Sequence, residues 1–374
     1  MYKGGIATKL KDKLTLPPLK YNALMPQVAI ENLKLIEVDD LISLIGKDID
    51  AIRCALEASP YGSHLSALPR QEVNAASLEE MILQNCIDTY KKLIKYSLRD
   101  VRSLLFAFLK KFEVANIKIL LRCVKAKIDT VTALKFIIPV DVLDRNRSKT
   151  ILAQSQSISD VINALSDVNY GAILKDALRR NNASEDLLQL EIALDKAIYQ
   201  EIWESAKNLS RVDKKIAMNI IGIELDTINL KIILKCKALA VSENLINEYF
   251  MPTALFDQAI LDKATKATST KEILHLFLSA AEGGHIIYKN ILNQMLKEHD
   301  APLSRFEAII DKAPLIMSLY MLKEHTRYFN IGFALAFLNL KWIEIRNLMC
   351  IINGTVRKLA PIQIRKLLIL PNEL

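Results

Sequence analysis

Glycine is scarce in this sequence, with ten residues among 374, whereas average proteins contain about 7%. Glycine loses the most backbone entropy in a helix, so its scarcity is typical of long helices joined by few loops. Alternating polar and apolar runs, which indicate β-strands, are also lacking. The nearest candidate, residues 136–140, is interrupted by Pro139. The sequence therefore predicts an all-α fold.

Long apolar runs are missing as well, although the mean hydropathy is +0.18. The longest stretch without a charged residue, Tyr328–Leu340, has thirteen residues, and a membrane-spanning helix needs about 20. The basic start of the chain has no apolar segment of the kind found in secretory signals. Five scattered cysteines are typical of reduced cytosolic thiols. We expect a cytoplasmic protein.

Signatures of catalysis and of cofactor binding are absent from the sequence. It has neither a G-x-x-x-x-G-K-[ST] loop nor a G-x-G-x-x-G motif, so the usual phosphate-binding loops are excluded. Its five histidines form no H-E-x-x-H motif, and no cysteine pair has zinc-ligand spacing. No catalytic residue, cofactor or metal is predicted.

The formal net charge is +8, but the cations are spread along the chain singly or in pairs. We find no dense basic cluster and no basic motif interleaved with aromatic residues, which nucleic-acid-binding proteins often carry. A solvated basic surface, useful against an acidic protein partner, is favoured over a nucleic-acid partner.

An internal repeat organises the chain. The segment Glu113–Val124 (EVANIKILLRCV) aligns with Asp226–Lys237 (DTINLKIILKCK), with identity at five of twelve positions. A third copy, EIRNLMCIINGT, begins at Glu344. The offsets, 226 − 113 = 113 and 344 − 226 = 118 residues, are too long for a simple solenoid unit. Each repeat is therefore predicted to be a small helical domain.

The third repeat is incomplete at its end but has a relative near the N-terminus. Tyr170-Gly171 lies in a block of repeat 1 that matches a block around Tyr61-Gly62. Residues 24–68 are thus predicted to supply the missing half, giving three pseudo-threefold-related repeats that form a closed funnel or socket. The predicted division is an N-terminal tail (1–23), the completing segment (24–68), repeat 1 (78–178), repeat 2 (187–291) and repeat 3 (304–374).

Helical periodicity is clearest in repeat 1. Val114, Ile117, Leu121, Val124 and Ile128 are spaced as one apolar stripe on a helix. Earlier in the chain, Ser77-Leu-Glu-Glu80 has the pattern of a capping box, which predicts a helix that starts at Ser77.

Each copy of the aligned segment carries an acid and an asparagine at i and i+3, on one helical face. Two interpretations are open: a threefold ring of polar groups lining a central cavity, or a buried hydrogen-bond network between neighbouring helices. The second is favoured, because asparagine weakens an exposed helix. The pairs are Glu113/Asn116, Asp226/Asn229 and Glu344/Asn347.

Two copies also carry like-charged pairs at i and i+4, namely Lys118/Arg122 and Lys231/Lys235. Such pairs cost an isolated helix about 0.2–0.5 kcal/mol. One explanation is that these cations are solvated or pair with acids on a neighbouring helix. The other is that they bind a protein partner. We assign them as candidate partner-binding residues. The third copy has Met349 and Asn353 at these positions.

These segments resemble the C subunit of archaeal A-type ATP synthases, which is related to the d subunit of vacuolar ATPases. The resemblance is carried by Ile331–Ile369, with its E-I-R-N-L core and closing I-R-x-L-L, by LEASPYGSHL (56–65) and by KFEVANIKILLRCVKAK (111–127). It covers roughly residues 24–371. The family's usual Pro-Leu-Gly is Asn330-Ile331-Gly332 here.

The resemblance implies a funnel of three helical domains on the cytoplasmic face of a membrane rotor ring. Such a protein receives the foot of the central stalk, transmits torque and binds no nucleotide. Its implied partners are the central-stalk subunits and the proteolipid ring, with peripheral membrane association, and we expect the isolated chain to be monomeric. The main alternative is a helical protein-binding scaffold unrelated to ATPases; a nucleic-acid-binding protein and an enzyme follow.

Overall fold

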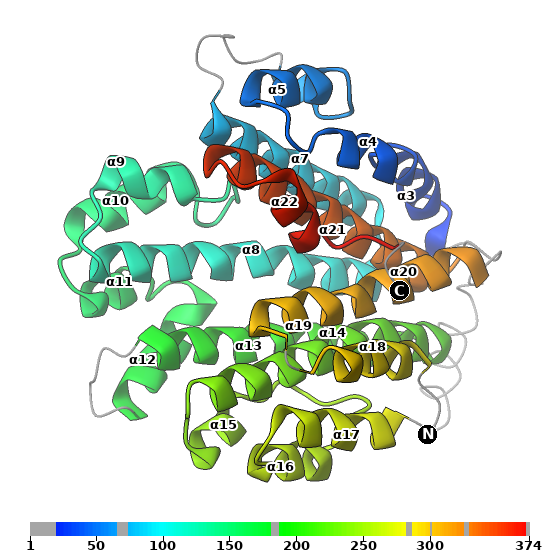
Figure 1. The fold of residues 1–374 in the computed structure, drawn as a ribbon. Helices are drawn as coiled ribbons and strands as arrows, with labels where there is room; N and C mark the ends of the chain where they lie inside the picture. Colours follow the sequence, from blue (N-terminus) through cyan, green and yellow to red (C-terminus); the bar gives the residue numbers. More distant parts are fainter. Residues whose placement is uncertain are drawn as a thin grey trace, which may run out of the picture.

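The computed structural model describes residues 20–65, 74–180, 187–281, 286–299, 301–324 and 329–371. Every regular element in these ranges is helical and none is a strand, so the all-α prediction is confirmed (Figure 1). Three long helices dominate: α8 (Arg99–Lys125), α14 (Arg211–Ala238) and α21 (Ile331–Val356). Each follows another helix after a short connection, namely α7 (Ala75–Tyr96), α13 (Leu187–Lys207) and α20 (Lys312–Glu324).

Shorter helices occupy the segments between these pairs. The N-terminal ones are α3 (Leu24–Asn32), α4 (Val38–Ser43), α5 (Ile49–Glu57) and α6 (Gly62–Leu65). After α8 come α9 (Thr130–Ala133), η2 (Leu134–Phe136), α10 (Arg145–Gln154), α11 (Ile158–Ala164) and α12 (Asn169–Arg180). After α14 come α15 (Glu243–Tyr249), α16 (Gln258–Lys266), α17 (Thr270–Ala281), α18 (Ile286–Lys297) and α19 (Leu303–Ile310), and α22 (Pro361–Leu367) follows α21.

Packing between the six larger helices forms a closed circuit. Helix α7 packs on α8, α8 on α13, α13 on α14, α14 on α20, α20 on α21, and α21 again on α7. One large hydrophobic cluster runs through these contacts and includes side chains from residue 21 to residue 370. Among the described helices, none is both long enough and apolar enough to cross a bilayer.

The first turns of the three long helices meet around Lys20. Its ammonium Nζ lies 2.8 Å from Oδ2 of Asp100 on α8 and 3.2 Å from Oδ2 of Asp213 on α14. The other carboxylate oxygen of Asp213 accepts a hydrogen bond from the backbone N–H of Ile331 at the start of α21, 3.3 Å away. Gly332 allows this approach, because a Cβ there would lie 2.7 Å from the Ile216 side chain.

The opposite ends of the three long helices lie apart, where they lead into α9, α15 and α22 (Figure 1). Each of these ends has the same stop. A left-handed residue follows the helix, and the next N–H donates to a carbonyl five positions back, as in a Schellman motif. The bonds, all 2.9 Å, are Ile128 N–H to Cys123 O, Val241 N–H to Cys236 O and Leu359 N–H to Gly354 O.

Two local predictions are wrong. Helix α8 ends at Lys125, so Ile128 lies outside the helix in which its apolar spacing placed it. The reason is Lys127, whose φ of 53° is left-handed and therefore incompatible with a continued α-helix. Helix α7 begins at Ala75, with Asn74 as its N-cap and Ser77 in the third helical position. Asn74 and Ser77 cap each other, so the capping box starts three residues before the predicted one.

The N-terminal segment lies against α21. Helix α3 packs on α7 and on α21, and α5 packs on α21. The hydroxyl of Thr355 donates to the backbone carbonyl of Lys47, 3.3 Å away. Gly46, with a φ of 82°, turns the chain beside Pro361. These contacts join residues near both ends of the sequence, while the proposed domain boundaries themselves stay a prediction.

Candidate functional site: the three long helices and the cavity between them

The asparagines of the repeat are buried and make the same contact three times. Each side-chain oxygen accepts a hydrogen bond from a backbone N–H that lies 22 positions later, at 2.8 to 2.9 Å. Each side-chain nitrogen donates to the carbonyl of that same residue, at 2.8 to 3.3 Å. The pairs are Asn116–Ile138, Asn229–Met251 and Asn347–Ile369. These bonds form a buried hydrogen-bond network, but they join each long helix to the non-helical segment that follows it rather than to a neighbouring helix.

The reciprocal bond has a structural consequence. The segment that returns after each long helix is not itself helical at Ile138, Met251 or Ile369, so its backbone N–H and C=O need side-chain partners when buried. An asparagine amide presents an N–H donor beside a C=O acceptor, which is the required arrangement. The three side chains therefore hold the return segments against the long helices.

The three acids of the repeat have different surroundings. Asp226 accepts hydrogen bonds from the backbone N–H groups of Ala254 and Leu255 at 3.3 and 2.9 Å, and burial raises its pKa to about 7. Burial also raises the pKa of Glu113. Glu344 instead forms an ion pair with Lys341 at 2.9 Å.

The four candidate partner-binding cations all pair with carboxylates, on α13 in the first copy and on or next to α19 in the second. Lys118 lies 2.5 Å from Asp195, and the Arg122 guanidinium makes two bonds of 2.6 Å to Glu191. In the second copy Lys231 pairs with Asp311, and Lys235 pairs with Glu307 at 2.6 Å. The geometry favours the alternative of internal partners. Binding of another protein through these residues stays a prediction.

The third copy has a neutral version of the outer pair. The side-chain amide of Asn353 donates to Glu79 on α7 at 2.5 Å, where the other two copies have a cation facing Glu191 or Glu307. The substitution therefore keeps the interhelix contact without its formal positive charge.

A cavity of about 310 Å³ lies between the three long helices. One side of its lining is aromatic: Phe112 stacks edge-on against Tyr90 and Trp342, with ring centroids 5.6 and 5.5 Å apart. The other side is charged. Lys111 pairs with Glu224 at 2.5 Å. The remaining charged lining residues are Lys231, Asp311 and Arg346, of which Arg346 bonds Asp311 at 2.9 Å.

Apart from Lys231, the cavity residues were missed by sequence reasoning, although a signal was present. Lys111, Glu224 and Trp342 each lie two positions before the acid of their repeat, so the alignment places them at one equivalent site. They differ in charge and in size. A search for residues that are identical in the three copies does not find such a position. An asymmetric cavity lining nevertheless requires the three copies to have different residues there.

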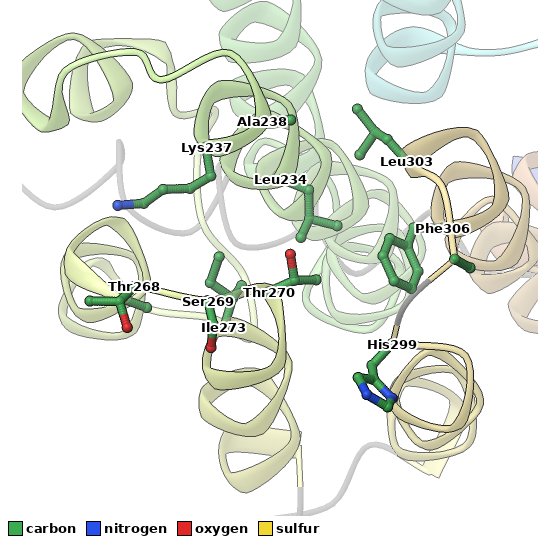
Figure 2. Close-up of a pocket in the computed structure, with 12 residues that line it drawn as sticks. Leu234, Lys237, Ala238, Thr268, Ser269, Thr270, Ile273, His299, Leu303 and Phe306 are labelled. Carbon is green, nitrogen blue, oxygen red and sulfur yellow. The ribbon is translucent and has the colours of Figure 1, made fainter.

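A second pocket, of about 320 Å³, lies between the end of α14 and the start of α17 (Figure 2). Lys237, Thr268 and His299 contribute polar atoms to its lining, and Phe306 an apolar ring. The first turn of α17 is already capped, since Glu272 N–H donates to the Ser269 hydroxyl at 3.2 Å. Within the described ranges no group of three or more histidine, cysteine or acidic residues could hold a metal ion.

The fold and site thus define an all-helical protein in which three long helices surround a cavity with aromatic and charged sides. The family model of the ATP synthase (C/AC39) subunit matches residues 31–367. The chain belongs to this family, which confirms the resemblance found in its sequence.

Three similar proteins are C subunits of A-type ATP synthases. The protein from Methanocaldococcus jannaschii is 26% identical over 339 residues, which cover 90% of this chain and 80% of that protein. The one from Methanosphaera stadtmanae is 25% identical over 281 residues, covering 75% and 71%. The one from Pyrococcus horikoshii is 23% identical over 319 residues, covering 84% and 80%.

Proposed function

We propose that this chain is a non-catalytic rotor subunit of an archaeal- or vacuolar-type rotary ATPase. It couples the central stalk to the proteolipid ring, at the cytoplasmic face of the membrane and without spanning it. Membership of the ATP synthase (C/AC39) subunit family is the main support. The lack of phosphate-binding loops in the sequence supports a role without nucleotide binding.

We propose further that the three repeats are related by approximate threefold rotation, with residues 24–68 completing the third. Three observations support this arrangement. The asparagine bonds recur at the same sequence separation, the long helices end in the same motif, and the packing of the six larger helices returns to its start. An open array of repeats has two free ends and does not need such a circuit.

The cavity between the long helices is the proposed seat of the stalk. The observation that carries this proposal is that the helices converge at Lys20 and separate toward their other ends. Torque must pass through side chains that differ around the axis, because a perfectly symmetric lining would let a stalk foot slip between equivalent positions. Lys111, Glu224 and Trp342 supply such a difference.

Purification of the tagged chain from native membranes tests the function. We expect the central-stalk and proteolipid subunits to co-purify in fixed proportion, and the isolated chain to sediment as a monomer. Recovery of unrelated proteins with no ATPase subunits would support the scaffold alternative instead.

A matched pair of variants tests the seat of the stalk. Arg346→Gln removes a half-exposed cation from the cavity lining, where it bonds Asp311 at 2.9 Å. The control is Arg145→Gln, which breaks a surface ion pair to Glu80, also at 2.9 Å, away from the cavity. Only the first variant should weaken binding of purified stalk subunits. Equal effects, or none, would contradict this seat.

A further inference from the structure

The converging ends of the long helices expose an unusual set of side chains, here called the apex surface. It consists of Leu98 and Arg99 at the start of α8, Arg211, Val212 and Lys215 at the start of α14, and Phe329 just before α21. The three helix starts are held together by Lys20 and Asp213. The apex surface is therefore one patch assembled from three segments that lie far apart in the sequence.

Three of its members are apolar and extend into solvent. The exposed fractions are 49% for Leu98, 68% for Val212 and 45% for Phe329. Single exposed apolar side chains are common on proteins. Here they occur at three helix starts that Lys20 and Asp213 hold together, so the three side chains belong to one end of the molecule.

The cations of the apex surface have no folding role that the described residues reveal. Arg99, Arg211 and Lys215 are exposed and make no ion pair within these ranges. Nearby Arg102 differs, since it donates to the backbone carbonyls of Ser97 and Lys95.

The acids of these first turns do not offset the cations. Asp100 and Asp213 are already bound by Lys20. Lys20 and these two acids carry a formal charge of −1 together, and Arg99, Arg211 and Lys215 add +3. These six groups of the described apex therefore sum to +2.

From this juxtaposition we propose that the apex surface binds the headgroup region of an anionic lipid bilayer. Exposed Leu, Val and Phe side chains insert into the boundary between headgroups and acyl chains, while adjacent arginines and lysines contact phosphates. We favour a bilayer over a folded protein partner, because the apex surface includes no exposed acid that would fix the orientation of a bound protein. Neither membrane insertion nor phosphate contact requires a fixed orientation.

The inference goes beyond the proposed function, since it assigns lipid contact to the chain itself rather than through the ring. Its test uses the isolated full-length chain and vesicles only. A negative result would leave the proposed function intact, and a positive result would not by itself establish that function.

The experiment measures co-sedimentation with vesicles of phosphatidylcholine, alone or mixed with phosphatidylglycerol. We expect binding only to the mixed vesicles and weakening as salt is added. Each cation near an anionic leaflet contributes a factor of about five in binding, so Arg99→Gln, Arg211→Gln and Lys215→Gln together should weaken it by about 100-fold. The set Leu98→Ser, Val212→Ser and Phe329→Ser should also reduce it.

Matched controls lie at the opposite helix ends. Val131, Phe136 and Ile362 are similarly exposed apolar residues, and Lys135, Lys358 and Lys366 are exposed cations. Changing these sets to serine and glutamine should leave vesicle binding unchanged. The proposal is overturned if the native chain does not bind anionic vesicles, if the control substitutions abolish binding, or if the substitutions in the apex surface leave binding unchanged.

Discussion

The hydroxyl of Tyr61 donates a hydrogen bond to the carboxylate of Glu344, 2.5 Å away, although 283 positions separate them in the sequence. The ammonium of Lys341 lies 2.8 Å from the same hydroxyl and 2.9 Å from the same carboxylate. All three side chains are buried. A buried ion pair is tolerated only when further hydrogen bonds satisfy its atoms. Tyr61 thus ties the N-terminal segment to α21 and completes the pair.

Tyr61→Phe should therefore destabilise the protein by about 1–3 kcal/mol, because it leaves a buried ammonium and carboxylate each short of a partner. Urea unfolding of native and variant chains measures this cost. Tyr320→Phe is the control, since Tyr320 is half exposed, and it should change stability little. Equal effects at both positions would show that the Tyr61 hydroxyl has no special role.

Replacing each repeat asparagine by alanine should cost about 2–4 kcal/mol, since it leaves a buried N–H and C=O unpaired. Asn116→Ala should cost most, because its amide also donates to the carbonyl of Leu143 at 3.1 Å. Asn219→Ala, at an exposed position on α14, should cost little and serves as the control. Costs near zero at all three buried sites would contradict the hydrogen-bond network.

The sequence predicted the asparagine sites because both the residue and its spacing are repeated. Other features left no such trace. The Schellman stops use Lys127, Ala240 and Lys358 rather than glycine, so the usual marker of a helix end is missing. The bond between Tyr61 and Lys341 joins residues 280 positions apart. Pattern within one segment cannot predict which distant residue satisfies a buried charge.

Ala240→Gly should stabilise the chain by about 0.4–1 kcal/mol, because the φ of Ala240 is 53° and glycine adopts this conformation without a steric cost. Ala238→Gly, two positions earlier and still within α14, should destabilise by about 0.5–1 kcal/mol. Thermal unfolding of both variants measures the two shifts. Shifts of the same sign would mean that Ala240 does not end the helix in solution as described.

Asp226 should make stability fall as pH rises. Burial raises its pKa from the ordinary 3.8 to about 7, so between these values the folded chain holds a proton that the unfolded chain has released. The folded state is favoured by that proton at low pH, and the advantage is lost as pH increases through the folded pKa. A difference of this size corresponds to on the order of 4 kcal/mol.

Asp226→Asn removes the ionisation while its side-chain oxygen can still accept from the Leu255 N–H. Relative to the native chain, the variant should gain stability progressively from about pH 4 to about pH 7, as followed by urea unfolding across that range. Asp39→Asn, at an exposed site on α4, should leave the profile unchanged. A parallel pH dependence for native and Asp226→Asn chains would rule out Asp226 as its source.

Variants of the four cations Lys118, Arg122, Lys231 and Lys235 distinguish between the two explanations of their like-charged spacing. Each faces a carboxylate of α13 or a carboxylate on or next to α19. Partly exposed ion pairs contribute about 0–1 kcal/mol each. Replacing Lys118, Arg122 and Lys235, which lie outside the cavity lining, with glutamine should therefore cost about 1.5 kcal/mol in thermal unfolding and leave the affinity for purified stalk subunits unchanged.

The complementary variant makes this test specific. Changing the facing acids Glu191, Asp195 and Glu307 to their amides breaks the ion pairs of Lys118, Arg122 and Lys235 but keeps these cations. Internal pairing predicts a loss of stability similar to that of the cation variant, since either change removes the interhelix attraction. Binding of a partner through the cations predicts instead that the glutamine variant keeps its melting temperature but loses stalk affinity and its salt dependence. In that case the acid variant, with its cations released, should bind the stalk at least as well as the native chain.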